Sequence, residues 1–223
     1  HVGSWNFAAT AYLNRWKVKI YYEHYFDDHS QMFFQYGRWK DGHIGLEITF
    51  PKNRFIDTFV YEGLGTKDQT GPMLYDSFWG KFEEQISAKD NYYNHYLYQG
   101  WQHWGMGIGN PLLPGPIYNK NGQITFISNR VLAHHIGFCG SPCQSLSYRM
   151  LLSYSRHWGT YDNPLNEIKK QFNSLFEVTY APQQLKGWSF TVSGAMDRGS
   201  ILGNNYGGML VIRKQGIIKS GNK

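Results

Sequence analysis

Residues 188–197 alternate between apolar and polar side chains along their whole length. One face carries Trp188, Phe190, Val192, Gly194 and Met196, and the other carries Ser189, Thr191, Ser193, Ala195 and Asp197. Successive side chains of a strand point to opposite sides, so the pattern predicts a strand with one apolar face. The same period recurs in residues 146–155, where only Leu151 interrupts it, and in residues 16–27, whose polar side carries full charges.

Strands of this length are typical of proteins that cross a membrane as a barrel. A tilted strand needs about 9–11 residues to span a bilayer, whereas strands of soluble proteins average about 5–6. Lipid-facing and lumen-facing residues alternate along each strand of such a barrel. The sequence therefore predicts an all-β fold, an antiparallel transmembrane β-barrel of the outer membrane, and disfavours the alternative of a soluble lectin-like sandwich.

The chain reads as a single domain over residues 1–223, because no linker divides it and barrels of this size are common. Its pattern predicts about nine strands. They cover residues 5–11, 16–27, 43–50, 54–64, 130–138, 146–156, 171–180, 188–197 and 207–213. Between them lies a long excursion rich in glycine and aromatic residues, 65–122, after which strands are predicted to resume near Phe126. Residues 77–90 predict a short helix within this excursion, because Phe78, Phe82 and Ile86 lie four apart.

Composition narrows the possible locations and partners. Aromatic residues make up 17% of the chain, and many lie at the ends of predicted strands, as in the aromatic girdles of barrels, although aromatics also favour strands and sugar-binding surfaces in general. The net charge of +6 is spread along the chain, so nucleic acid is not an expected partner. A positive excess would suit phosphate-bearing lipopolysaccharide or an acidic polysaccharide, although a charge of this size also occurs in proteins without such a ligand.

Membrane insertion through helices is excluded, because the chain has no run of about 18 apolar residues. The chain also begins without Met and without a signal peptide, which we interpret as a sign of a processed or truncated protein.

Several motifs follow one another from about residue 90 to the end of the chain. They are Tyr92-Tyr93-Asn94-His95, Tyr98-Gln99-Gly100-Trp101, Gly107-Ile108-Gly109-Asn110-Pro111-Leu112, Ser128-Asn129-Arg130-Val131-Leu132-Ala133-His134-His135-Ile136-Gly137, Ser153-Tyr154-Ser155-Arg156-His157-Trp158-Gly159-Thr160-Tyr161 and Asp197-Arg198-Gly199. In order and spacing this set resembles the capsule-assembly outer-membrane proteins, the Wzi family, in its Bacteroidetes branch.

The resemblance implies a bacterial outer-membrane barrel of about eighteen strands that retains or helps assemble capsular polysaccharide without catalysis. With about nine strands, this chain is similar to the carboxy-terminal half of such a barrel. The partners implied are outer-membrane lipid and lipopolysaccharide, capsular polysaccharide and other outer-membrane proteins. The alternative function is an outer-membrane pore or an accessory subunit of another outer-membrane complex.

The candidate polysaccharide-binding residues fall into two groups. The first is aromatic and lies in the excursion: Tyr92, Tyr93, Trp101 and Trp104. Flat apolar rings match the C–H faces of pyranoses, and the alternative is simple packing of the loop. The second group is Arg130, His134 and Arg156, on or at the ends of predicted strands, with a structural hydrogen-bonding role as the alternative. His134 and His135 cannot both face the lumen, and no carboxylate lies nearby in sequence, so no metal site is expected.

Cys139 and Cys143 flank a predicted loop in the motif Cys-Gly-Ser-Pro-Cys. Exported compartments are oxidising, so we predict a disulfide between them.

Ser155 and His157 share one face of a predicted strand, but neither a third catalytic residue nor an oxyanion donor can be identified. The sequence therefore predicts a protein without enzymatic activity and without a cofactor.

Overall fold

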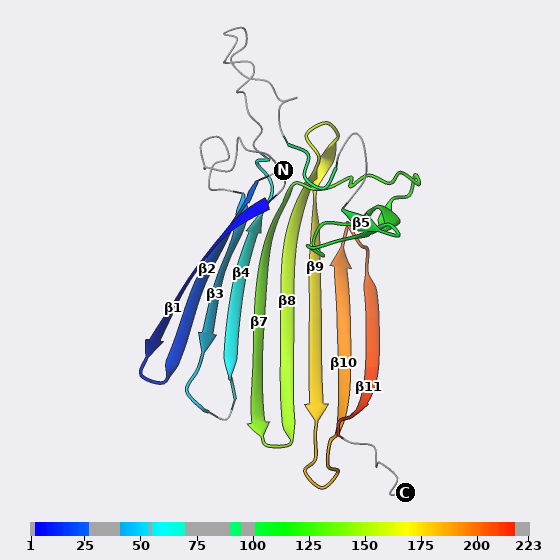
Figure 1. The fold of residues 1–223 in the computed structure, drawn as a ribbon. Helices are drawn as coiled ribbons and strands as arrows, with labels where there is room; N and C mark the ends of the chain where they lie inside the picture. The colour runs from blue at the N-terminus through cyan, green and yellow to red at the C-terminus, as the bar shows by residue number, and fades with distance from the viewer. Residues whose placement is uncertain (1–2, 27–40, 54, 70–89, 95–100, 217–223) are drawn as a thin grey trace, which may run out of the picture.

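A computed structural model describes residues 3–26, 41–53, 55–69, 90–94 and 101–216 of the chain. Nine strands form one antiparallel sheet in the order β1-β2-β3-β4-β7-β8-β9-β10-β11 (Figure 1). Their bounds are β1 Gly3–Leu13, β2 Trp16–Phe26, β3 Gly42–Thr49, β4 Thr58–Gly65, β7 Val131–Cys143, β8 Leu146–Gly159, β9 Pro164–Tyr180, β10 Trp188–Gly199 and β11 Asn205–Lys214. The predicted all-β antiparallel class and the strand number are confirmed.

The connections differ between the two ends of the sheet (Figure 1). At one end the turns are short: Asn14 and Arg15 join β1 to β2, and Gln144 and Ser145 join β7 to β8. Asn14 has a φ of 56°, a left-handed conformation that asparagine tolerates better than most residues. At the other end the chain enters β1, and the long connection from β4 to β7 begins and ends there.

The strands near the middle of the sheet are longer than predicted. β7 continues to Cys143, β8 to Gly159, and β9 begins at Pro164, so the polar segments predicted as loops at 137–144 and 157–170 are largely strand. Phe126, where a strand was predicted, lies instead in the β4–β7 connection. The prediction treated the polar residues of these segments as a sign of loops, whereas they belong to the polar face of the strands. The helix predicted over residues 77–90 falls almost wholly outside the described residues.

The register gives the sheet one apolar face and one polar face. One row across the apolar face is Ala11, Val18, Ile48, Phe59, Phe138, Met150 and Phe176. One row across the polar face is Glu62, His135, Ser153, Asn173, Asp197 and Asn205. Directly opposed residues share a face, so the alternation seen in single strands combines into two continuous surfaces.

The small buried core lies against the polar face, at the end of the sheet with the long connection. Leu64 of β4 and Val131 and Ala133 of β7 pack there with Leu113 and Phe126 of the β4–β7 connection. Phe126 and Val131 are fully buried. The connection also contains the two-residue strands β5 (Gln102–His103) and β6 (Met106–Gly107) and the 3-10 helix η2 (Pro116–Tyr118). The connection therefore folds back over the polar face and covers one end of it.

The two edge strands, β1 and β11, run in the same direction, because every pairing between neighbours in the nine-stranded sheet is antiparallel. Within the described ranges these two edges do not pair with each other. The part of the chain described here contains no helix that is long and apolar enough to cross a membrane.

Candidate ligand-binding pocket

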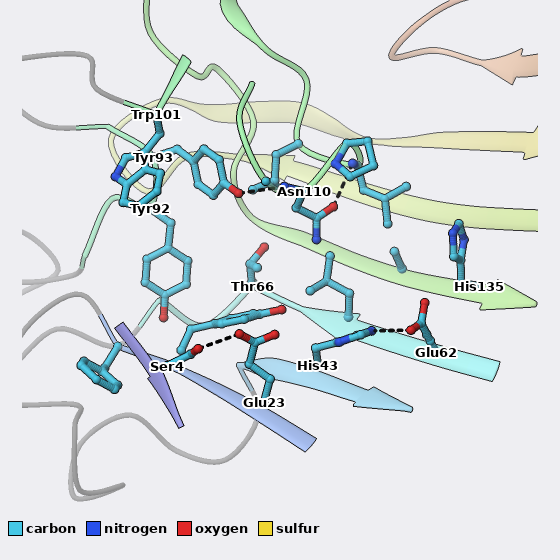
Figure 2. Close-up of a pocket in the computed structure, with 18 of the residues that line it drawn as sticks. Ser4, Glu23, His43, Glu62, Thr66, Tyr92, Tyr93, Trp101, Asn110 and His135 are labelled. Atoms are coloured by element: carbon cyan, nitrogen blue, oxygen red, sulfur yellow. Dashed lines mark hydrogen bonds and ion pairs between the residues drawn. The ribbon is translucent and has the colours of Figure 1, made fainter. Parts of the chain in front are cut away.

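A cavity of about 590 Å³ lies between the polar face and the connection that covers it (Figure 2). Its floor comes from β1, β2, β3, β4 and β7, and its roof comes from residues 92–93, 101 and 109–113 of the connection. The volume falls in the range of about 300–1,000 Å³ that is usual for small-molecule sites. Carboxylates, imidazoles and aromatic rings meet in this one space.

The floor carries two carboxylates and an imidazole on neighbouring strands. His43 of β3 lies opposite Glu23 of β2, and its Nε2 is 3.5 Å from Oε1 of Glu62 on β4. Ser4 donates a hydrogen bond from its hydroxyl to Oε1 of Glu23 at 2.7 Å (Figure 2). Tyr21 donates to Oε1 of Glu62. These contacts hold the carboxylates in place at the cavity wall.

The roof is tied to the sheet through Asp41, the residue before β3. Its carboxylate accepts hydrogen bonds from the backbone N–H groups of Asp68 at 3.0 Å and Gln69 at 2.5 Å, and from the Tyr92 hydroxyl at 3.2 Å. Burial of the carboxyl group raises the pKa of Asp41 to about 6. Asn129 donates from Nδ2 to the carbonyl of Tyr92 at 2.7 Å. The roof residue Tyr92 is thus held at both its backbone and its hydroxyl.

Tyr93 joins two segments of the roof. Its ring packs edge-on against Phe126, with centroids 5.0 Å apart, and lies 5.9 Å from the ring of Trp101. Its hydroxyl accepts a hydrogen bond from the backbone N–H of Asn110 at 3.1 Å. Burial raises the pKa of the Tyr93 hydroxyl. With a φ of 69°, Tyr93 also has an uncommon left-handed backbone, a conformation that clusters at binding sites.

The structure brings together three of the four predicted aromatic residues. Tyr92, Tyr93 and Trp101 all line the cavity. Tyr92 is almost fully buried, whereas Trp101 is 42% exposed. Trp104, at the turn between β5 and β6, is 86% exposed and does not line the cavity. Among the predicted rings, Trp101 is therefore the one best placed to stack on a ligand.

The predicted group of Arg130, His134 and Arg156 is not brought into the cavity. The Arg130 guanidinium lies 3.8 Å from the centre of the Tyr161 ring, and its Nε donates to the carbonyl of Lys67 at 3.0 Å. His134 borders the cavity through its strand, but its side chain is on the apolar face, where Nδ1 is 2.8 Å from the Tyr61 hydroxyl.

Arg156 also belongs to the apolar face, with its guanidinium 5.5 Å from the centre of the Trp158 ring. Strand alternation explains both placements. His135 and Ser155 occupy the polar face, so their neighbours His134 and Arg156 must face the other way.

The lining residues that the sequence-based prediction of the site did not include contain two carboxylates and two imidazoles: Glu23, His43, Glu62 and His135. Their common signal is that each lies on the polar side of a predicted strand. Only the register shows that Glu62 pairs with His135 and that Glu23 pairs with His43. His135 is in turn hydrogen-bonded to Ser153 of β8.

The predicted disulfide is not present, because Cys139 and Cys143 are both free thiols. Both lie within β7, not on either side of a loop. An extended chain rises about 3.3 Å per residue, so residues four apart lie about 13 Å apart, beyond the reach of a disulfide. A bulge between Gly140 and Cys143 shortens this distance but does not fold the strand back.

Ser155 and His157 form part of a buried hydrogen-bonded group, so their role is structural. Ser155 Oγ is 2.9 Å from His157 Nε2, Ser128 Oγ is 3.4 Å from Nδ1, and all three side chains are buried. A substrate cannot reach a serine in this position.

Among the residues described by the structure, no group of three or more His, Cys, Asp or Glu side chains is arranged to hold a metal ion.

Comparison of the chain with models of protein families, with curated proteins and with solved structures found no match. The functional argument therefore depends on the two faces of the sheet and on the pocket.

Proposed function

We propose that the nine-stranded sheet is part of the wall of a bacterial outer-membrane β-barrel, and that the pocket binds a segment of surface polysaccharide and retains it without catalysis. The observation that carries this proposal is the continuous apolar face. Large apolar side chains on it are exposed in strands across the sheet, among them Ile20 (54%), Val192 (60%) and Leu210 (66%). An apolar surface of this extent needs an apolar surrounding, and lipid provides one.

The height of the apolar face supports the proposal that the sheet is part of a membrane barrel. On β9 the stretch of this face that follows Lys170 and carries no charged residue runs from Phe172 to Tyr180. At about 3.4 Å per residue this is about 27 Å along the strand, or about 21 Å across the bilayer at a tilt of about 40°. The apolar band of outer-membrane barrels is about 25 Å tall and ends in aromatic girdles. On β8 the same face carries Tyr148 near one end and Tyr154 near the other.

The parallel direction of β1 and β11 sets a condition for closing the barrel. In a barrel in which all neighbours are antiparallel, the strands that join these two edges must be odd in number. Nine further strands satisfy this condition and agree with the barrel of about eighteen strands that the family resemblance implies.

Polysaccharide binding is supported by the position and the lining of the pocket. The pocket lies at the end of the sheet with the long β4–β7 connection, and long loops of outer-membrane barrels are extracellular. Trp101 offers an exposed ring for the C–H face of a sugar, while Glu23 and Glu62 offer acceptors for its hydroxyl groups. Neither lysine nor arginine is found among the described lining residues, which favours a neutral or amine-bearing sugar over a uronic acid.

The test compares Trp101→Ala with Trp104→Ala. Loss of a stacking ring should cost on the order of 1 kcal/mol, by analogy with aromatic pairs, so Trp101→Ala should release polysaccharide from cells. Trp104→Ala is the matched control, because it removes an exposed ring of the same connection that lies outside the pocket. The measurement is the ratio of cell-bound to shed polysaccharide at equal surface levels of protein. An unchanged ratio in the Trp101→Ala strain would contradict the binding role and favour a pore or an accessory subunit.

A further inference from the structure

The charged residues on the apolar face all have the same sign. Among the described strands, the Lys, Arg, Asp and Glu side chains on this face are Arg156, Lys170, Arg198 and Lys214. No carboxylate is found among them. The polar face, by contrast, mixes both signs, as in the Lys17–Glu47 ion pair at 3.5 Å and the Arg149–Glu177 ion pair at 3.4 Å.

Three of these four cations lie together at the end of the sheet that carries the pocket. Arg156 of β8 lies directly opposite Lys170 of β9. Arg198 of β10 lies opposite Phe172, two residues from Lys170 on the same face, and is therefore its diagonal neighbour. Directly opposed residues are about 4.5–5.5 Å apart at Cβ and diagonal ones about 7–8 Å. Like charges at these separations repel each other, and a shared anion would offset the repulsion.

A fourth cation joins this surface through an aromatic ring. Lys67 Nζ lies 5.0 Å from the centre of the Trp158 ring, and the Arg156 guanidinium lies 5.5 Å from the same ring. We call Lys67, Arg156, Lys170 and Arg198 the cationic rim. Along β8 and β9 the rim residues Arg156 and Lys170 follow Tyr154 and Phe172 on the same face, and the aromatic Trp158 follows Arg156. In the proposed barrel this is the level of the lipid headgroups.

We propose that the cationic rim binds the phosphate groups of lipopolysaccharide in the outer leaflet. This inference depends on the proposed barrel orientation, which places the rim at the outer surface of the membrane. The charge complementarity is direct, because lipid A carries phosphates on a glucosamine disaccharide and arginine can bind a phosphate through two parallel hydrogen bonds. Lys170 and Arg198 are exposed and available for these contacts.

The test uses the full chain reconstituted in phosphatidylcholine nanodiscs that contain bisphosphorylated lipid A or, at the same mole fraction, dephosphorylated lipid A. The affinity for lipid A is measured by native mass spectrometry. The rim variant is Arg156→Gln/Lys170→Gln/Arg198→Gln. The variant removes three cations that would each attract the anionic lipid, so it should bind bisphosphorylated lipid A at least about tenfold more weakly.

The matched control removes the same charge from the polar face: Lys17→Gln/Lys19→Gln/Arg213→Gln. It should retain the affinity of the unmodified protein, and inorganic phosphate at millimolar concentration should not displace the lipid. Equal affinity for dephosphorylated lipid A, equal losses in both variants, or displacement by inorganic phosphate would each overturn the proposal. A chain that inserts into nanodiscs but shows no phosphate dependence refutes the cationic rim alone, whereas a chain that remains soluble without lipid refutes the proposed barrel as well.

Discussion

At the scale of single residues, the pocket combines side chains that the sequence marks with side chains that it does not. Tyr92, Tyr93 and Trp101 could be predicted because aromatic residues are concentrated in a glycine-rich segment. Glu62 and His135 could not, since their proximity depends on the pairing of β4 with β7, which are separated by the long connection. Asp41 shows the same limit, because its buried contacts come from residues 27, 28 and 51 positions further along the chain.

Asp41 should make the roof of the pocket sensitive to pH. Its folded pKa of about 6 exceeds the ordinary value of 3.8, so the folded state holds the proton more tightly. The stability of the roof should therefore be greatest near pH 4 and fall as the pH rises to about 6, by an amount on the order of 3 kcal/mol. Hydrogen exchange at the Asp68 and Gln69 amides, corrected for intrinsic rates, measures this change.

Asp41→Asn should abolish the pH dependence while lowering protection at every pH, because the amide NH₂ group only donates and cannot replace the carboxylate oxygen that accepts one of the two backbone hydrogen bonds. Asp57→Asn, near the start of β4 at the other end of the sheet, is the control and should leave the profile unchanged. Protection of these two amides that is constant from pH 4 to 6 in the unmodified protein would show that Asp41 is not the group responsible.

At the scale of secondary-structure elements, the pairing of β2, β3 and β4 depends on a glycine. Gly45 of β3 lies opposite both Tyr21 of β2 and Glu62 of β4. The Tyr21 ring covers Gly45, and its hydroxyl reaches Glu62. A methyl group at position 45 would overlap the Tyr21 ring. The strand pattern predicts β3 from its apolar residues, but it does not reveal that a neighbouring aromatic ring occupies the place of a side chain.

Gly45→Ala should destabilise the sheet by about 1–3 kcal/mol, the usual cost of forcing a packed side chain out of position. It should also separate Tyr21 from Glu62 and alter the pocket floor. The matched control is Gly207→Ala on the same face of β11, where an added methyl group meets no atom within 4 Å. Denaturant unfolding in detergent micelles measures both. Equal stability of the two variants would mean that Tyr21 does not pack on Gly45.

At the scale of the whole molecule, the two faces of the sheet set the surroundings that the protein needs. The polar face is partly covered by the β4–β7 connection, while the apolar face is left without a covering element among the described residues. A layered soluble fold would bury that face against helices or a second sheet. Lipid is the covering that we propose.

The whole protein should therefore partition into the outer-membrane fraction and require detergent to stay dispersed. Its exposed apolar side chains would otherwise associate with one another in water. Membrane fractionation followed by size-exclusion chromatography with and without detergent provides the measurement. Recovery of a monodisperse folded protein from the soluble fraction in the absence of detergent would contradict the proposed barrel.

The sequence by itself determined the strands, the alternation of apolar and polar side chains along them and the presence of one apolar face, because these properties depend on neighbours two residues apart. It also marked the aromatic connection that forms the roof of the pocket. Only the tertiary structure decided which polar residues meet, where the strands end, that Cys139 and Cys143 are held apart, and that Arg156, Lys170 and Arg198 gather on one face. These properties depend on register, and a shift of one residue between strands would move every side chain to the opposite face.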